Sequence, residues 1–304
     1  MRWDYPFVLP NWLKAWWSVF SKGLSASILS VSDGEELIGI APLVVHGERA
    51  CFIGDRDVCD YMDFIVAPGK GQEFCSILLN HLRQRGVTWL DLGPVRPDST
   101  AFTHLMDHEK GMDWEVSCEQ EDVSYELELP RSWDEFLGVL PGKQRHEIRR
   151  KLRRLHEAGD ARYRLVESEE GVEEEIEDFL RLFRSNRPDK AAFMTGQMAS
   201  FFRSLAESMA KDHILKLFFL DLDKRPVAAV MCFDYNSTTY LYNNGYDRDY
   251  SSLNVALISK VLNIKAGIER GMERYDFLKG DEDYKHQLGG KRVPLYRCQA
   301  RLRK

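Results

Sequence analysis

The alternation of hydrophobic and polar residues along the first third of the chain predicts strands and helices in succession. Aromatic residues recur at helical spacing over 12–20, and Asn11 stands where an N-cap would lie. Residues 25–54 alternate as antiparallel strands that break at two glycine-containing turns. Residues 71–86 carry a helical apolar face that ends at a glycine, and 87–93 read as a short buried strand.

The rest of the chain continues this succession. A helix is predicted to begin at Asp98 or Ser99, and residues 113–130 alternate like an edge strand or a hairpin pair. Helical periodicity is strong over 132–159 and 167–186. The remaining predicted elements are a helix over about 196–211, three strands over 213–247, a helix over about 252–271, and strands over 274–278 and 293–302 with a short helix between them.

The predicted elements fall into two similar series. Each series has antiparallel strands, a helix, a buried strand, another helix and a closing strand. We therefore expect an α+β fold with two domains, each a mostly antiparallel mixed sheet flanked by helices. The composition shifts after Pro130, so the domains are placed at 1–128 and 129–304, with 131–185 as a helical lead-in to the second.

Composition restricts the class of protein. The chain has 304 residues, of which 44% are hydrophobic and 30% charged, and its formal charge is −6. These values are typical of a globular protein with a real core, and they place any anion site in a local patch. The six cysteines are scattered without a CxxC pair, so we expect reduced core thiols and no metal site.

The amino-terminal segment affects the expected location. Its aromatic residues are interrupted by Asp4, Asn11 and Lys14, and no small-residue cleavage site follows. No stretch approaches the roughly 20 apolar residues that a membrane-spanning helix needs. We therefore expect a cytoplasmic protein without a membrane span.

Four sequence motifs point to a known family. They are "DYMDF" (60–64), "KQRHEIRRKLRRL" (143–155), "YLYNNGYD" (240–247) and "IERGMERYDFLKGDEDYKHQLGG" (268–290). Together they resemble the GNAT acyltransferases, in the branch of CelD-type acetyltransferases and Fem-type aminoacyl ligases. Members of this branch carry two GNAT-like domains in tandem, which agrees with the repeated series of elements.

The resemblance implies acyl transfer from a thioester, usually acetyl-CoA or another acyl-CoA, to an amine. In such folds a tyrosine on the helix after the fifth strand protonates the leaving thiolate, and Tyr284 occupies that position. A phenol suits this task because its ordinary pKa, near 10, lies slightly above that of a thiol. The alternative is that Tyr284 packs its ring between the helix and the sheet.

Asp276 and Lys285 flank the same strand-to-helix turn. Asp276 lies in a strand that is apolar on both faces, so its carboxylate must be paired or neutral. It is interpreted either as a general base or as half of a buried ion pair, with Lys285 or an arginine as its partner. Lys285 is also a candidate to hold an acidic group of the substrate.

Further substrate contacts are expected in both halves of the chain. Tyr242 and Tyr246 lie on the strand where GNAT folds bind the acyl donor, and they either line a cleft or pack in the core. Asp60, Tyr61 and Asp63 follow a strand and are interpreted as too polar for the core. They resemble a substrate-facing cluster of the family, and the alternative is an exposed loop.

The donor phosphates are expected at the start of the helix after the fourth strand, where GNAT enzymes use a glycine-rich turn. Here Leu253 stands in the glycine position, which departs from the family pattern. Ser251 and Ser252 are predicted to cap this helix and to donate hydrogen bonds. The predicted cofactor-binding residues are Arg248, Ser251, Ser252 and Asn254.

The basic tract over 143–154 has two interpretations. Ile148, Leu152 and Leu155 form one buried stripe, and seven lysines and arginines surround it. The tract is either a solvated helix that pairs with the acidic run over 167–178, or an anion site. The possible ligands of an anion site are coenzyme A phosphates, an anionic acceptor or a tRNA backbone. The lack of interleaved aromatic residues makes tRNA the less favoured of these ligands.

Taken together, the sequence predicts an acyltransferase that acts on an amine of a small molecule or a cell-envelope precursor. One alternative in the same fold is a Fem-type aminoacyl transferase that uses aminoacyl-tRNA. Another is a binding module that keeps the fold and has lost catalysis, which the leucine at position 253 favours and the intact Tyr284–Lys285 turn opposes.

Overall fold

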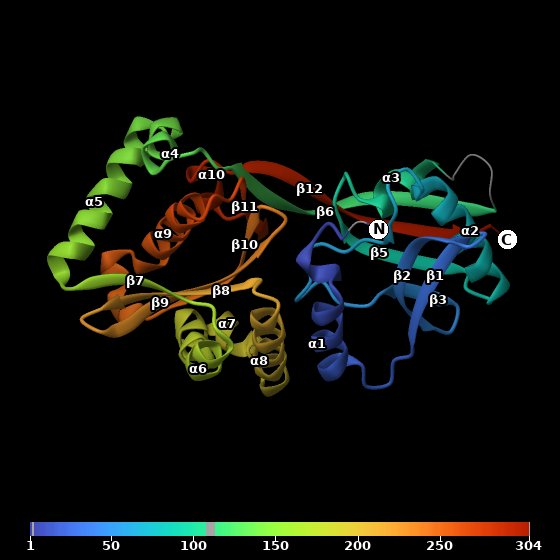
Figure 1. The fold of residues 1–304 in the computed structure, drawn as a ribbon, viewed down its shortest axis with the longest axis horizontal. Coiled ribbons are helices and arrows are strands. Elements are labelled where there is room, and N and C mark those ends of the chain that lie inside the picture. Colours follow the sequence, from blue (N-terminus) through green and yellow to red (C-terminus); the bar gives the residue numbers. More distant parts are fainter. Residues whose placement is uncertain (2, 108–112, 304) are drawn as a thin grey trace. The chain divides into compact units, whose positions relative to one another are not determined.

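The computed structural model describes residues 1, 3–107 and 113–303 and is drawn in Figure 1. The chain divides into two compact units, Met1–Val123 with Val293–Lys304, and Ser124–Arg292. This division differs from the predicted 1–128 and 129–304 mainly at the carboxyl end. The reason is that the last strand pairs with a strand of the first unit over Tyr296 to Arg301, so it leaves the second unit.

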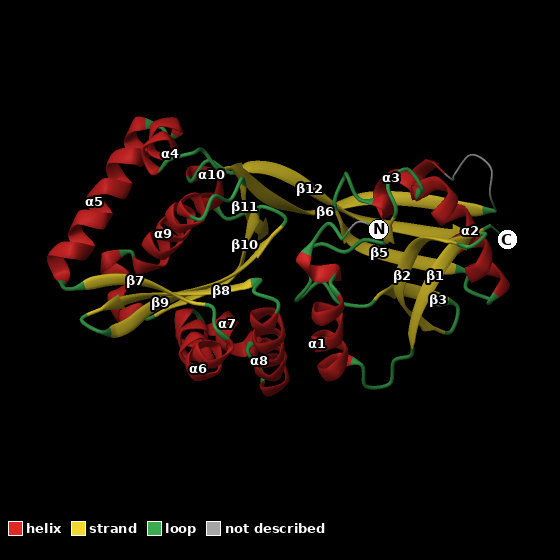
Figure 2. Ribbon diagram, in the orientation of Figure 1, coloured by secondary structure: helices red, strands yellow, loops and turns green. Residues whose placement is uncertain are grey.

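The fold is α+β, with one large mixed sheet that is mostly antiparallel and is flanked by helices (Figure 2). The strand order is β1-β2-β3-β5-β12-β6-β11-β10-β9-β8-β7, and β4 pairs with β2 outside this path. The parallel pairs are β3 with β5 and β10 with β11. The second of these pairs positions the candidate site.

The elements of the first unit confirm most of the predicted pattern. Its helices are α1 (Pro10–Phe20), α2 (Gly71–Gln84) and α3 (Thr100–Asp107). Its strands are β1 (Ala26–Asp33), β2 (Glu36–His46), β3 (Arg49–Phe52), β4 (Ile65–Val66) and β5 (Trp89–Val95). The predicted N-cap at Asn11 is wrong, because Pro10 occupies the first turn and Leu9 the N-cap position.

The second unit holds the longer helices. These are α4 (Trp133–Val139), α5 (Gly142–Ala158), α6 (Glu169–Asn186), α7 (Pro188–Phe193), α8 (Gly196–Lys211), α9 (Val255–Glu269) and α10 (Asp283–Gln287). Its strands are β7 (Ala161–Val166), β8 (Leu215–Leu222), β9 (Arg225–Tyr235), β10 (Thr238–Tyr246) and β11 (Arg274–Lys279). The sequence pattern did not predict β7.

Two long strands contribute residues to both units. β6 (Trp114–Glu128) is one continuous strand between β12 (Lys291–Leu302) and β11 in the strand order, so the prediction of an edge strand or a hairpin over 113–130 is wrong. Neighbouring positions on β6 and β12 also hold Cys118 and Cys298, which form a disulfide. The expectation of reduced thiols is therefore wrong for this pair, which is 180 residues apart in the sequence.

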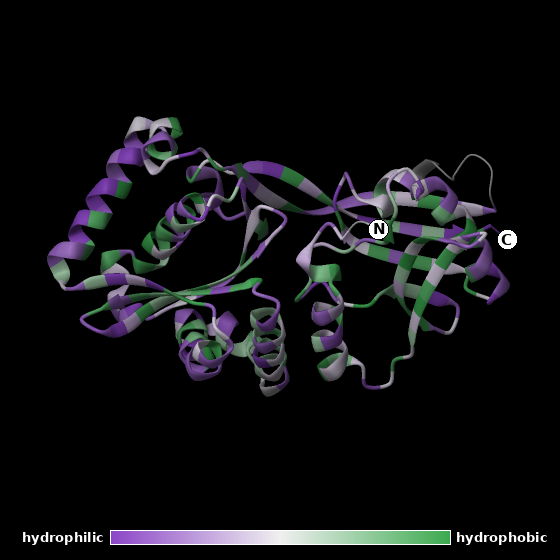
Figure 3. Ribbon diagram, viewed as in Figure 1, coloured by the Kyte–Doolittle hydropathy of each residue, from purple (hydrophilic) through white to green (hydrophobic). Residues whose placement is uncertain are grey.

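Helices cover both faces of the second unit's strands. α9 packs against β8, β9 and β10, while α6 and α8 pack from the opposite face (Figure 2). The strands between them alternate little and are apolar over most of their length (Figure 3), which is expected when both faces of a sheet are covered.

Contact between α6 and β10 requires a glycine. The backbone of Leu182 and Phe183 passes so close to Gly245 that a Cβ there would overlap it. Glycine therefore sets how closely α6 can approach the end of β10.

Among the described residues, no helix is both long and apolar enough to cross a membrane. The same part of the chain contains no group of three or more His, Cys, Asp and Glu side chains arranged to hold a metal ion.

Candidate functional site

The candidate site lies where β10 and β11 separate. The two strands pair in parallel over three positions only, from Thr238 opposite Arg274 to Tyr240 opposite Asp276. Beyond this point β10 continues beside β9, and β11 pairs with β6 at Lys279. The carboxyl ends of two adjacent parallel strands thus diverge, which is the part of an α/β arrangement where ligands bind.

Both strands are irregular at the point of divergence. The register of β10 on β9 shifts between Leu241 and Asn243, so Tyr242 is the extra residue of a β-bulge. In β11 the register shifts between Asp276 and Lys279, and Leu278 has a φ of 60°. The Asp276 carboxylate accepts a 2.8 Å hydrogen bond from the Leu278 N–H, which holds this strained residue in place.

Tyr284 is the second residue of α10, the short helix that follows β11. Its side chain is half-buried, its ring packs edge-on against Phe277, and the ammonium of Lys260 lies 4.7 Å from the ring centroid. Among the described residues its hydroxyl has no hydrogen-bond partner. Burial, followed by the nearby Glu282 carboxylate, raises the pKa of Tyr284 above its ordinary value, so the phenol is protonated near neutral pH.

Lys285 fixes the turn between β11 and α10. It is 2% exposed, and its ammonium donates to the carbonyl oxygens of Leu278, Lys279 and Gly280 at 2.7–3.1 Å. It also forms an ion pair with Glu282 at 2.9 Å. These contacts use every N–H of the ammonium, so a substrate carboxylate would find no donor here.

Asp276 is 1% exposed and lies directly below this turn on β11. The ion pair that the structure gives to Lys285 is with Glu282, not with Asp276. The Asp276 carboxylate accepts from the backbone N–H of Leu278, two residues ahead, and so shapes the bend in β11. Its role as a general base stays a prediction.

Sequence reasoning missed two lysines that contact residues of the candidate site. Lys260 on α9 is 6% exposed and donates to the carbonyl of Ala256, and it has no ion pair within the described residues. Lys190 on α7 donates to the carbonyl of Asn244, in the separated part of β10, and lies 4.6 Å from the ring centroid of Phe183. A lysine within the otherwise apolar run of α9 is the signal that could have revealed the first.

Both of these lysines have a lowered pKa. Burial and then the charge of Lys190 lower the pKa of Lys260 to about 7, while Glu282 opposes the change. Burial, with the charge of Arg187, lowers the pKa of Lys190 to about 8. Lowered lysine pKa values next to a half-buried tyrosine are typical of a functional site.

The tyrosines of β10 lie among apolar side chains. Tyr242 is 8% exposed, and its ring stacks on Phe202 of α8 and packs against Phe233 of β9. Tyr246 is half-buried at the border of a core cluster that includes Leu155 and Val255. These contacts match the packing interpretation, and the prediction that either tyrosine lines a cleft stays untested.

The turn before α9 differs from the predicted cap. Residues Arg248–Leu253 form a short 3-10 helix capped by Asp247, and Asn254, with a φ of 57°, is the N-cap of α9. Ser251 and Ser252 are exposed and do not cap α9, so that expectation is wrong. Leu253, in the family's glycine position, packs on the cluster around Leu155, which explains why a leucine fits there.

The first-half cluster divides in two. Tyr61 and Asp63 are 0% and 3% exposed, so the interpretation that they are too polar for the core is wrong. Asp63 accepts backbone N–H bonds from Phe64, Thr100 and Ala101, and so it caps α3, although burial raises its pKa to about 7. Asp60 is half-buried, and its role in substrate binding stays a prediction.

Tyr61 belongs to an aromatic cluster. Its ring packs edge-on against Tyr5 and Phe7, and the guanidinium of Arg96 lies 5.2 Å from the ring centroid. These contacts explain how a tyrosine in a polar stretch is fully buried.

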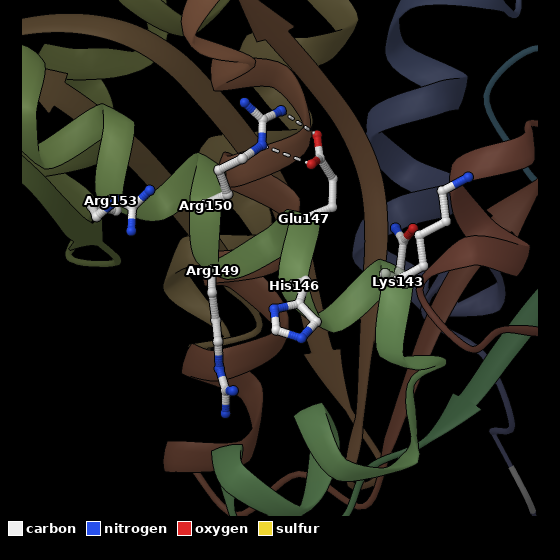
Figure 4. Close-up of a pocket in the computed structure, with 7 residues that line it drawn as sticks. Lys143, His146, Glu147, Arg149, Arg150 and Arg153 are labelled. Atoms are coloured by element: carbon white, nitrogen blue, oxygen red, sulfur yellow. Dashed lines mark hydrogen bonds and ion pairs between the residues drawn. The ribbon is translucent and has the colours of Figure 1, made fainter.

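The basic tract forms α5, where Ile148 and Leu155 are buried as predicted. A hollow of about 650 Å³ runs along its outer side (Figure 4), lined by Lys143, Gln144, His146, Glu147, Arg149, Arg150 and Arg153. Among the residues that the structure describes, the ion pairs of the tract stay within α5, as between Arg150 and Glu147. The acidic run pairs instead with Arg164, Arg181, Arg203 and Lys216. The predicted pairing of the tract with that run is therefore wrong.

The predicted residues thus fall into separate groups. Tyr284, Asp276 and Lys285 meet at the end of β11, and Tyr242 lies on the neighbouring β10. Arg248, Ser251, Ser252 and Asn254 lie in the turn before α9. The cluster over 60–63 belongs to the first unit.

A family model described as an acetyltransferase (GNAT) domain matches residues 142–286, which contain the diverging strands, Tyr284 and both lysines. This part of the chain is a GNAT-superfamily domain. The resemblance recognised from the sequence is thereby confirmed. Comparison with curated protein sequences gives no match.

Solved structures share the fold of this chain over nearly its whole length. The structure of FemX matches with a TM-score of 0.66 at 13% identity, over 96% of this chain and 92% of that one. L-PGS from Bacillus licheniformis matches with a TM-score of 0.61 at 11% identity, over 97% and 92%. A conserved protein of unknown function from Bacteroides thetaiotaomicron matches with a TM-score of 0.59 at 12% identity, over 96% and 90%. At such identities the likeness is one of fold.

Proposed function

We propose that this protein is an N-acyltransferase that moves an acyl group from an acyl-CoA thioester to the amine of a small molecule or a cell-envelope precursor. The observation that carries the proposal is the hydroxyl of Tyr284. It belongs to a tyrosine that follows the diverging strand β11 in a GNAT domain, and it has no hydrogen-bond partner among the described residues.

The residues around the divergence have distinct roles in this reaction. When the amine attacks the thioester carbon, negative charge develops on the carbonyl oxygen and then on the leaving sulfur. The β-bulge at Tyr242 lies where β10 leaves β11, and the thioester carbonyl is expected at this point of divergence. Tyr284 then gives its phenolic proton to the sulfur, the amine nitrogen loses one proton to solvent as the amide forms, and solvent reprotonates the phenolate.

The turn before α9 offers groups for the donor phosphates. Arg248, Ser251 and Ser252 are exposed there, and no side chain caps the N-terminus of α9. Because Leu253 points into the core cluster, it does not occupy this surface. These residues therefore fit a donor with a pyrophosphate, despite the missing glycine.

The second candidate is aminoacyl transfer from aminoacyl-tRNA, as in the Fem-type branch. The exposed cations of α5 favour it, since Lys143, Arg149 and Arg154 are exposed and have no ion pair within the described part of the chain. The fold likeness to FemX is consistent with this candidate and with tandem GNAT-like domains.

The test is thiol release from acetyl-CoA and longer acyl-CoAs in the presence of a panel of amines. We expect amine-dependent release that falls about 10²-fold in Tyr284→Phe, the scale for loss of a general acid. Tyr163→Phe is the matched control, because it removes a buried hydroxyl that bonds the Ser259 carbonyl on α9. No release with any pair, together with transfer from aminoacyl-tRNA, would reverse the order of the two candidates.

A further inference from the structure

Two lysine ammonium groups from different helices contact residues of the candidate site. Lys190 comes from α7 and bonds the Asn244 carbonyl of β10 at 2.7 Å. Lys260 comes from α9, on the opposite face of the strands, and lies over the ring of Tyr284. The charge of Lys190 acts on Lys260, and Glu282 at the start of α10 acts on both lysines.

The positive charge in this place is not balanced. Of the charged groups that face the two lysines, Arg187 already pairs with Asp189, and Glu282 already pairs with Lys285. Lys190 and Lys260 each have one carbonyl acceptor and one aromatic ring as neighbours, and neither forms an ion pair within the described residues. An ammonium has three N–H donors, so both keep donors free.

A buried ammonium without a counter-charge is costly, and proteins keep such groups where they act. Lys285 shows the alternative within the same turn, because its three donors and its charge are all satisfied by the protein. The difference between Lys285 and the other two lysines indicates that their missing partner comes from outside the chain.

We propose that Lys190 and Lys260 form a receptor for a carboxylate carried by the substrate. The proposal rests on the proposed function in one respect, namely that the ligand takes part in acyl transfer next to Tyr284. A carboxylate suits the place because its two oxygens can each accept from one ammonium. It comes either from the acyl group, as in a dicarboxylic acyl donor, or from the acceptor, as in an amino acid.

The proposed receptor can be tested by ligand binding, without catalysis. At about pH 8, above the lowered pKa of Lys260, the binding of an anion must draw a proton onto the lysines. Titration calorimetry with succinate alone, in two buffers of different ionisation enthalpy, measures this uptake. We expect net proton uptake in the unaltered protein. In Lys260→Met and in Lys190→Met, the proton uptake should be lost and the affinity for succinate should fall at least about tenfold.

Lys265→Met is the matched control on the same helix, because Lys265 is 40% exposed and pairs with Glu269. It should bind succinate with unchanged proton uptake. Succinate binding without proton uptake, or binding that survives in both Lys190→Met and Lys260→Met, would overturn the receptor.

Substrate pairs then identify the source of the carboxylate. A preference for succinyl-CoA over acetyl-CoA that disappears in Lys260→Met assigns it to the donor, and a preference for an amino acid over its amide assigns it to the acceptor. Succinate binding with proton uptake but no transfer would support the receptor and reject the proposed function. Transfer that needs Lys260 equally with charged and uncharged substrates, without succinate binding, would reject the receptor and leave acyl transfer standing.

Discussion

Replacing Lys260 with methionine should stabilise the protein, and the gain should depend on pH. Methionine has a similar length and fills the same space on α9 without bringing a charge into the core. The surrounding residues Val261 and Ile264 are almost fully buried, and so the position is one where an apolar side chain is expected. The lysine is therefore kept at the expense of stability.

The magnitude follows from the pKa of Lys260, which falls from 10.5 to about 7 on folding. Since the unfolded chain binds the proton more tightly, the free energy of unfolding rises with pH between about 7 and 10.5 and is lowest below this window. One pKa unit corresponds to about 1.4 kcal/mol, so the full cost is on the order of 5 kcal/mol. Lys260→Met should remove this destabilisation, which is largest near and below pH 7.

Thermal melts of both proteins at pH 6, 8 and 10 measure the effect. We expect the melting temperature of Lys260→Met to exceed that of the unaltered protein by on the order of 10 °C at pH 6, with a difference that shrinks toward pH 10. Lys265→Met should show no such pH-dependent gain, because that lysine is partly exposed. A difference that is constant from pH 6 to pH 10, or a destabilised variant at pH 6, would refute the assignment of a strained buried ammonium.

Three further predictions follow from other parts of the structure. Gly245→Ala should lower the free energy of unfolding by more than about 3 kcal/mol in urea titrations, because its Cβ would overlap the backbone of α6, and Gly196→Ala, where a Cβ meets nothing within 4 Å, should be close to neutral. Tyr284→Phe should keep the melting temperature within a few degrees while slowing transfer about 10²-fold, and an unchanged rate would assign the ring to packing. Replacing Arg149, Arg150 and Arg153 with Glu should leave acyl-CoA turnover nearly unchanged, because coenzyme A offers these cations only a few phosphates. For the same reason, donor binding should depend only weakly on salt concentration. A log–log slope steeper than about −3 that is lost in this variant would make aminoacyl-tRNA the donor.

The sequence predicted the elements whose periodicity comes from burial on one side. α6 and α8 have regular apolar faces, and both were expected close to their observed bounds. β6 and β7 were harder to predict, because the alternation of polar and apolar residues indicates only that one face of a strand is buried. It does not tell which strand lies beside another, and this also hid the pairing of Cys118 with Cys298.

The candidate site was predicted in part for a similar reason. The turn from Asp276 to Lys285 stands out because ionisable residues follow an apolar strand without interruption. Lys190 gives no such signal, since it lies in an exposed-looking helix and becomes half-buried only through β10 and Phe183. Lys285 was expected to hold an acidic group of the substrate. Only the structure shows that the ammonium of Lys285 donates to three carbonyls of the protein, whereas that of Lys260 donates to one.

The unpaired charges of Lys190 and Lys260 would also affect the electrostatics of the proposed reaction. The positive charge of Lys190 and Lys260 beside Tyr284 favours the anions that form during acyl transfer, the oxyanion and the thiolate, over their neutral precursors. A bound carboxylate would restore charge balance, raise the pKa of Lys260 and so keep its ammonium protonated next to the phenol. Substrate binding and the electrostatics of the reacting centre would then be coupled through the same two side chains. An uncharged substrate would leave Lys260 largely neutral near pH 8, so selectivity for an acidic substrate should appear in kcat as well as in KM.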